Sequence, residues 1–144
     1  MADFMSTEAR SRVMASIRSN NTKPEKQLGS MMFKAGLRYR KYVKDLPGKP
    51  DFVFSGSKVV VFVDGDFWHG WRFPQWEHKM EKPYWKEKIN KNRERDKKNH
   101  ATLRRMGWKV IRVWEHQLKD NPDKVLARII HGVRDGKADQ ETSF

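Results

Sequence analysis

The amino-acid sequence predicts an α/β protein with a central mixed β-sheet flanked by helices on both faces. The segment Lys58–Asp64 is apolar on both of its sides, which is typical of a central strand that helices cover on either face. The expected order is helix, helix, three strands, loop, long helix, strand, helix, and it fits such layers. A chain of 144 residues is long enough for a single core, so we expect one domain over residues 1–144.

The charge balance indicates a polyanionic partner. The formal net charge of +13 favours nucleic acid or an anionic membrane surface. The sequence has no run of about 18 apolar residues, so we expect neither a transmembrane helix nor a membrane partner. Its N-terminus lacks the layout of a signal peptide, which predicts an intracellular protein. Cysteine is absent, which excludes disulfides and thiolate zinc sites. Nucleic acid is therefore the expected partner.

The N-terminal region is expected to be helical. Residues 1–22 are predicted to form a basic helix, with Met14 in its short apolar stripe, and a polar linker; this region is expected to contact the nucleic acid. A second helix is predicted to begin at Thr22. Glu25, three residues later, fits a capping box with Thr22, and Gly36 is expected to end the helix.

The next strands are expected to bring two carboxylates together. A strand from about Leu37 to Val43 is followed by a rigid turn and the strand Asp51–Phe54. A turn at 55–57 then leads into Lys58–Asp64, so Asp51 opens one strand and Asp64 closes the next. In an antiparallel hairpin these two ends lie side by side. We therefore expect the two carboxylates to be neighbours.

A long loop and a long helix carry the next signals. Residues 65–83 form an aromatic loop, and a loop of this length in a compact domain tends to be functional. The helix predicted from about Tyr84 to Met106 is the most basic element of the chain. An acid on the inward row of such a helix indicates a partner inside the protein. That row contains Trp85, Ile89, Asn92, Asp96, His100, Leu103 and Met106.

The C-terminal region is expected to return to the core. Residues 108–114 alternate enough to be a strand, and residues 125–133 have the apolar stripe of a closing helix. Residues 134–144 are predicted to be a loose tail.

The polar residues beside the predicted hairpin suit phosphodiester cleavage. This reaction needs a neutralised phosphate, an activated water and an assisted leaving oxygen, and carboxylate-bound Mg²⁺ supplies much of this. Asp51, with Asp64 or a nearby main-chain carbonyl, offers the oxygen ligands that Mg²⁺ prefers. His69 is a candidate general base because imidazole titrates near neutral pH. Asp96, on the inward row of the long helix, is a candidate to orient His69.

Several blocks of the sequence resemble the very-short-patch repair endonuclease (Vsr) family. The blocks are Arg12–Arg18, Pro24–Lys26, Pro47–Val53, Asp64–Gly70, Lys91–Asp96 and Gly107–Glu115, within a resemblance over roughly residues 6–118. The resemblance implies a restriction-endonuclease-like fold and a Mg²⁺-dependent endonuclease that nicks one strand of double-stranded DNA beside a T:G mismatch. It also implies a monomer in the cytoplasm of a prokaryote, associated with the nucleoid, with repair-pathway proteins as candidate partners.

The resemblance also implies roles for individual residues. Asp51 would bind the metal together with the Val63 carbonyl, and Glu25 would support the site. His69, held by Asp96, would activate the attacking water. The residues that match the family's wedge, which intercalates beside the mismatch, are Met14, Phe67 and Trp68. On the long helix, the basic residues expected to contact DNA are Lys91, Arg93 and Arg95.

The chain departs from the family pattern at two places. Asp64 stands where the best-known members have a histidine, which makes it a candidate catalytic residue and a candidate metal ligand beside Asp51. Those members also hold a structural zinc through cysteines and histidine, whereas here Asp66 and His116 stand at two cysteine positions. We therefore expect no zinc, and an Asp66–His116 ion pair or hydrogen bond in its place.

Ordinary structural roles compete with several of these assignments. Met14 fits a helix core as well as a wedge. Phe67 and Trp68 fit a core beneath the loop. Glu25 fits a capping box, and Asp96 fits a pair with a neighbouring cation. For the whole protein, the alternatives are a restriction-like nuclease of different specificity and a non-catalytic protein that bends DNA.

Overall fold

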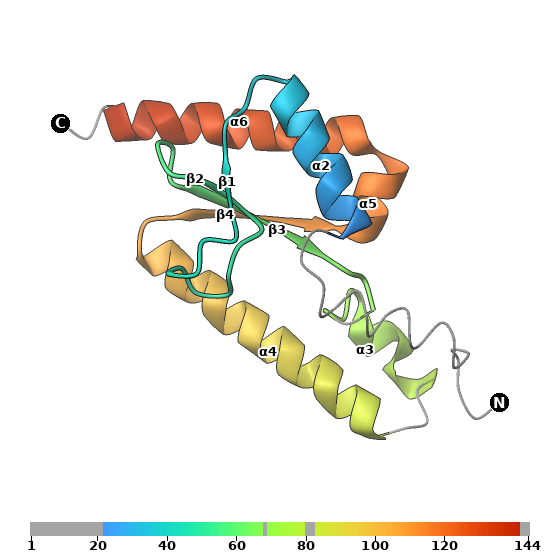
Figure 1. Cartoon of the computed structure of the whole chain (residues 1–144). Helices are drawn as coiled ribbons and strands as arrows, with labels where there is room; N and C mark the ends of the chain where they lie inside the picture. Colours follow the sequence, from blue (N-terminus) through green and yellow to red (C-terminus); the bar gives the residue numbers. More distant parts are fainter. Residues whose placement is uncertain (1–21, 68, 80–82, 142–144) are drawn as a thin grey trace.

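The structure is a computed structural model, and its sheet lies between two layers of helices (Figure 1). It describes residues 22–67, 69–79 and 83–141, so the predicted first helix, Met14 and Trp68 lie outside the described residues. The predicted α/β class and the flanked sheet are confirmed. The elements are α2 (Lys23–Lys34), β1 (Arg40–Lys41), β2 (Phe52–Phe54), β3 (Val59–Asp64), α3 (Phe73–Trp76), the 3-10 helix η1 (Glu77–Lys79), α4 (Pro83–Arg105), β4 (Lys109–Trp114), α5 (Glu115–Asp120) and α6 (Pro122–Glu141).

The sheet is mixed and has the strand order β1-β2-β3-β4. Strand β2 pairs antiparallel with both β1 and β3, whereas β3 pairs parallel with β4. Val61 in β3 lies opposite Phe52 on one side and Ile111 on the other. Strand β3 is therefore the central strand that its apolar faces predict, and the antiparallel β2–β3 hairpin is confirmed.

Alternation along β3 divides the core into two parts. Val59 and Val61 pack on the side of α2 and α6, whereas Val60 and Phe62 pack with Leu103 of α4. Figure 1 shows α4 on one face of the sheet and α2 and α6 on the other. Successive side chains of a strand point to opposite faces, so Asp64 follows Val60 and Phe62 onto the α4 face.

The inward row of α4 is polar in its middle. Asn92, Asp96 and His100 are buried between the buried apolar side chains of Ile89 and Leu103, as the sequence predicts. Met106 is a correction: its exposed fraction is 46%, because α4 ends at Arg105 and Met106 already lies in the turn. The polar middle of α4 faces the polar end of β3.

Several elements differ from the prediction in extent, or were not predicted. β1 contains only Arg40–Lys41, because Tyr42 has a φ of 54° and leaves the extended conformation. The aromatic loop contains the short helices α3 and η1, and α5 was not predicted. The expected loose tail is wrong for residues 134–141, which extend α6. Gly136 packs so closely on the β2–β3 turn that a side chain there would collide with the Ser57 carbonyl.

Among the described helices, none combines the length and the apolar character needed to span a bilayer.

Candidate active site

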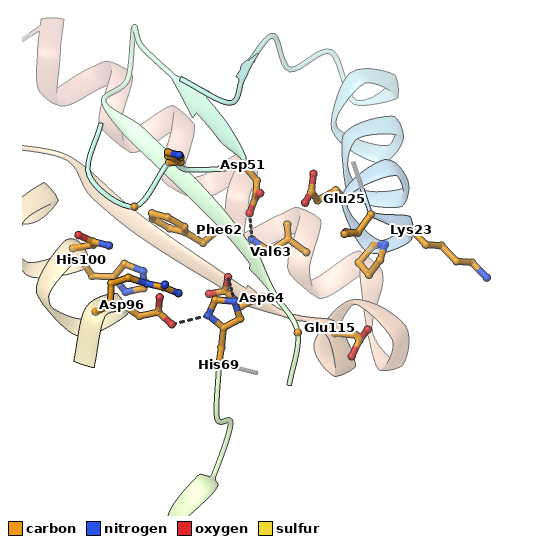
Figure 2. Close-up of a pocket in the computed structure, with 17 residues that line it drawn as sticks. Lys23, Glu25, Asp51, Phe62, Val63, Asp64, His69, Asp96, His100 and Glu115 are labelled. Atoms are coloured by element: carbon orange, nitrogen blue, oxygen red, sulfur yellow. Dashed lines mark hydrogen bonds and ion pairs between the residues drawn. The ribbon is translucent and has the colours of Figure 1, made fainter. Parts of the chain in front are cut away.

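A cleft of about 770 Å³ opens beside the polar end of β3 (Figure 2). The start of α2 borders it on one side and the polar row of α4 on the other. All five residues predicted to be catalytic reach this cleft, and they come from α2, the start of β2, the end of β3, the loop that follows β3, and α4. They are Glu25, Asp51, Asp64, His69 and Asp96, and Val63 lines the cleft as well.

Asp51 lies at the start of β2, where the hairpin places it beside the end of β3. Its Oδ2 accepts a hydrogen bond of 2.7 Å from the Val63 N–H. Burial raises the pKa of Asp51 to about 8; the bond from Val63 opposes the rise, and the charges of Glu25 and Asp64 add to it. Without a bound cation, the site therefore favours the protonated form of Asp51.

Glu25 is buried at the start of α2 and points toward Asp51 (Figure 2). Thr22 occupies the N-cap position but makes no side-chain capping hydrogen bond, so the geometry does not favour the capping-box alternative. Instead, the Tyr42 hydroxyl donates to Glu25 Oε2 at 2.6 Å. Sequence reasoning did not assign Tyr42 to the site. Its left-handed backbone is the kind of strain that accumulates at functional sites.

His69 lies between two carboxylates. Its Nδ1 is 2.6 Å from Asp96 Oδ2, and its Nε2 is 3.5 Å from Asp64 Oδ1. Burial alone would raise the pKa of Asp96, but the hydrogen bond and charge of His69 and the charges of Arg112 and Arg95 outweigh burial and lower it. An ionised Asp96 only accepts hydrogen bonds, so Nδ1 carries the proton. In the neutral ring, the unprotonated Nε2 is then able to accept a proton.

A tight approach between the loop and α4 brings His69 to Asp96. Gly70 follows His69 with a φ of 71°, a conformation that side chains rarely adopt. A Cβ at Gly70 would lie 2.6 Å from Arg93 Cδ and 2.9 Å from Ile89 Cγ2. Glycine at this position therefore lets the loop touch α4 one residue away from the imidazole.

Sequence reasoning also missed Arg112 on β4. Its Nε donates to Asp64 Oδ2 and its Nη2 to Asp96 Oδ2, each at 2.7 Å. The guanidinium carbon lies 4.1 Å from the centre of the Trp114 ring. The available signal was strand alternation: Ile111 and Val113 point to the buried α2–α6 face, so Arg112 must point to the α4 face.

The cleft offers two places for a cation. Oxygen and nitrogen donors of Asp64, His69 and Asp96 lie within 4.8 Å of one another. However, the Arg112 guanidinium already binds both of these carboxylates, and its positive charge disfavours a metal ion there. The better place is around Asp51, where Glu25 and Asp64 add negative charge. Hard oxygen donors of this kind fit Mg²⁺.

The predicted contact between Asp66 and His116 is confirmed. Asp66 Oδ1 lies 2.8 Å from His116 Nδ1, and the His116 ring lies 4.0 Å from the Trp71 ring, centre to centre. The pair links the loop that carries His69 to the start of α5.

The predicted DNA contacts are placed unevenly. Phe67 is half-buried and stacks on Trp76 at 5.7 Å, so it lies at the margin of an aromatic cluster as well as in the loop. Arg95 is exposed and lines the cleft. Lys91 is exposed and pairs with Glu87 at 3.2 Å, whereas Arg93 is half-buried with its guanidinium over Phe73. Arg95 is thus the one of these three cations that reaches the cleft.

Comparison with known proteins gives consistent matches. The profile of the family described as "DNA mismatch endonuclease Vsr" matches residues 2–75. The type II nicking enzyme V.XorIIP of Xanthomonas oryzae is 44% identical over 122 residues, which cover 83% of this chain and 89% of that protein. V.NmeAIP of Neisseria meningitidis, also a type II nicking enzyme, is 43% identical and covers 94% and 99%. The DNA mismatch endonuclease Vsr of Escherichia coli is 38% identical and covers 83% and 77%.

Proposed function

This chain belongs to the Vsr family of DNA mismatch endonucleases, and on that premise we propose that it nicks one strand of double-stranded DNA beside a T:G mismatch in a Mg²⁺-dependent reaction. As a member of the family it is an endonuclease that acts on DNA phosphodiester bonds. The observation that supports metal-dependent cleavage is the convergence of Asp51, Asp64 and the His69–Asp96 pair in one cleft, whereas the proposed T:G preference rests on the family resemblance.

The Asp51 side of the cleft is the proposed metal site. Asp51 and the Val63 carbonyl would hold Mg²⁺, with Asp64 as a third candidate ligand, and Glu25 would support Asp51 from α2. The raised pKa of Asp51 supports this assignment, because acids crowded together in a buried site are stabilised by a cation. When bound, Mg²⁺ neutralises charge on the phosphate and assists the leaving oxygen.

His69 is the proposed general base. Its Nε2 takes a proton from the attacking water, while Asp96 holds the other ring nitrogen and stabilises the imidazolium that forms. The water oxygen attacks phosphorus in line with the leaving 3′ oxygen. The bond from phosphorus to that oxygen breaks, and the oxygen takes up a proton from solvent water, which leaves a 5′-phosphate and a 3′-hydroxyl.

The DNA is proposed to lie against the basic side of the cleft. Arg95 would contact a backbone phosphate there, with Lys91 and Arg93 contributing along α4. Met14, Phe67 and Trp68 would insert beside the mismatch and unstack it. We further propose that the protein acts as a monomer in the prokaryotic cytoplasm, at the nucleoid, with repair-pathway proteins as partners and without a membrane partner.

The Asp66–His116 pair is proposed to hold the loop on α5 without a zinc ion. The 2.8 Å contact already joins the two segments, and the described chain contains no cysteine to hold zinc by thiolates. We expect elemental analysis of the purified protein to find no stoichiometric zinc. Zinc at one atom per chain would contradict this proposal.

The function is tested with labelled duplexes that contain a T:G pair, a T:T pair or only matched pairs. We expect a single nick in the T:G duplex with Mg²⁺, much slower cleavage of the other two, and none in EDTA. Equal cleavage of all three duplexes would favour a restriction-like nuclease of different specificity. Binding without cleavage would favour a DNA-bending protein.

Phe67→Ala is the specificity arm of the same assay. Loss of this wedge residue should reduce the T:G preference more than it reduces DNA affinity. The wedge is proposed to insert only beside the mismatch, so it contributes little to binding elsewhere on the duplex. Phe33→Ala is a matched control, because Phe33 is an exposed phenylalanine on α2. Equal losses of preference and affinity would assign Phe67 to the aromatic core.

A further inference from the structure

Within the described part of the chain, Arg112 is the residue that binds both carboxylates flanking His69. Two of its nitrogens are used, Nε on Asp64 and Nη2 on Asp96, and both bonds measure 2.7 Å. The Trp114 ring covers the guanidinium at 4.1 Å and restricts its movement. A planar guanidinium can donate to two carboxylates at once in this way, whereas the single ammonium group of a lysine cannot reproduce the geometry.

The hydrogen bonds form a connected network. Asp96 Oδ2 accepts from both His69 Nδ1 and Arg112 Nη2, so Arg112 holds the very oxygen that orients the imidazole. Asp64 uses Oδ2 for Arg112, which turns its Oδ1 toward His69 Nε2. Without the guanidinium, two buried like charges would border one imidazole, and repulsion would separate them.

We propose that Arg112 is a positioning residue of the nicking reaction, which fixes the His69 imidazole by clamping Asp64 and Asp96. The inference rests on the proposed role of His69 as general base. It also gives Asp64 a second role, because this carboxylate anchors Arg112 through Oδ2 whether or not its Oδ1 reaches a metal ion. Loss of either member of the Asp64–Arg112 pair should then disturb the imidazole.

The first test separates positioning from DNA binding. Arg112→Leu should lower kcat on the T:G duplex by about 10–100-fold, as is typical for residues that orient a ligand or base, with KM changed by less than about 3-fold. Arg112→Lys should recover part of the loss, because it restores charge but not the geometry of the two hydrogen bonds. The control Arg134→Leu removes a cation from α6, away from the cleft, and should leave kcat unchanged. A raised KM with unchanged kcat would overturn the proposal.

A double-mutant cycle tests whether Arg112 acts through His69. In a His69→Ala background, adding Arg112→Leu should lower kcat further by less than about 3-fold, because the residue that Arg112 positions is already gone. If the loss of kcat in the double variant equalled the product of the two single losses, Arg112 would have a role independent of His69, and the inference would be overturned. If His69→Ala alone kept full rate, the proposed general base would fail instead, so the two failures are distinguishable.

A spectroscopic readout is independent of activity. The 2.6 Å bond between His69 Nδ1 and Asp96 should give a low-field ring-proton NMR signal, identified by its absence in His69→Ala. Arg112→Leu should shift or broaden this signal, and Arg134→Leu should not. If Arg112→Leu does not fold, Arg112→Gln, which keeps a donor and most of the volume, takes its place. An unchanged signal in a folded Arg112 variant would contradict the proposal that Arg112 positions His69.

Discussion

Asp51→Ala is expected to reduce Mg²⁺-dependent nicking by about 10³-fold or more. Residues that only orient metal ligands account for about 10–100-fold, so loss of a direct ligand should cost more. The rate is measured on the T:G duplex at saturating Mg²⁺, and DNA affinity is measured separately. DNA affinity should change little, because in this basic protein the attraction for the DNA phosphates comes from cations, and this substitution removes none of them. Cleavage that persisted in this variant would remove the metal-site assignment.

Two variants sharpen the Asp51 experiment. Asp45→Ala is a matched control, because Asp45 is an exposed acid in the turn before β2. Asp51→Asn keeps the volume and an acceptor for the Val63 N–H but cannot ionise. It should lose activity as Asp51→Ala does, with less effect on the fold.

The pH dependence provides a further arm. Because the pKa of Asp51 is raised from 3.8 to about 8, Mg²⁺ must displace a proton, and the Mg²⁺ concentration for half-maximal rate should fall as pH rises toward 8. In the metal-free protein, the folded state retains the proton that the unfolded chain releases. The contribution of Asp51 to the free energy of unfolding should therefore fall as pH rises from 3.8 to about 8. Asp51→Asn should lack this slope.

His69→Ala is expected to lower kcat by about 10²–10⁴-fold, the usual contribution of a positioned general base. DNA affinity and the Mg²⁺ requirement should remain, because His69 contacts Asp96 and Asp64, and its removal leaves Asp51 and the Val63 carbonyl in place to hold the metal. The control is His131→Ala, which removes an exposed imidazole from α6. Full activity in His69→Ala would leave water activation to the metal ion alone.

Local patterns were sufficient for the parts of the site that lie on one continuous segment. The apolar run ending at Asp64 and the short turn before it predict the hairpin, and the hairpin alone makes Asp51 and Asp64 neighbours. Helical periodicity likewise identifies Asp96 as an acid on an inward row. In each case the spacing of residues along the chain determines the side to which a carboxylate points.

The remaining site residues depend on how separate elements cross. Tyr42 reaches Glu25 only because its left-handed backbone interrupts β1 and α2 packs beside it. Arg112 could be assigned to a face by alternation, but its two partners depend on the parallel register of β3 and β4 and on the position of α4. The length of α6 was missed for a related reason, because Gly136 packs on the β2–β3 turn, a contact that no apolar stripe in the sequence marks.

The sequence by itself determined the α/β class, the central strand, the hairpin carboxylates and the polar row of α4, because strand alternation and helical periodicity are properties of consecutive residues. Only the tertiary structure decided that Arg112 joins Asp64 to Asp96 around His69. That contact needs β3, β4 and α4 at one place. The physical reason is that a buried carboxylate pairs with whichever cation the packing brings within hydrogen-bond distance. The spacing of residues along the chain does not predict which cation that is.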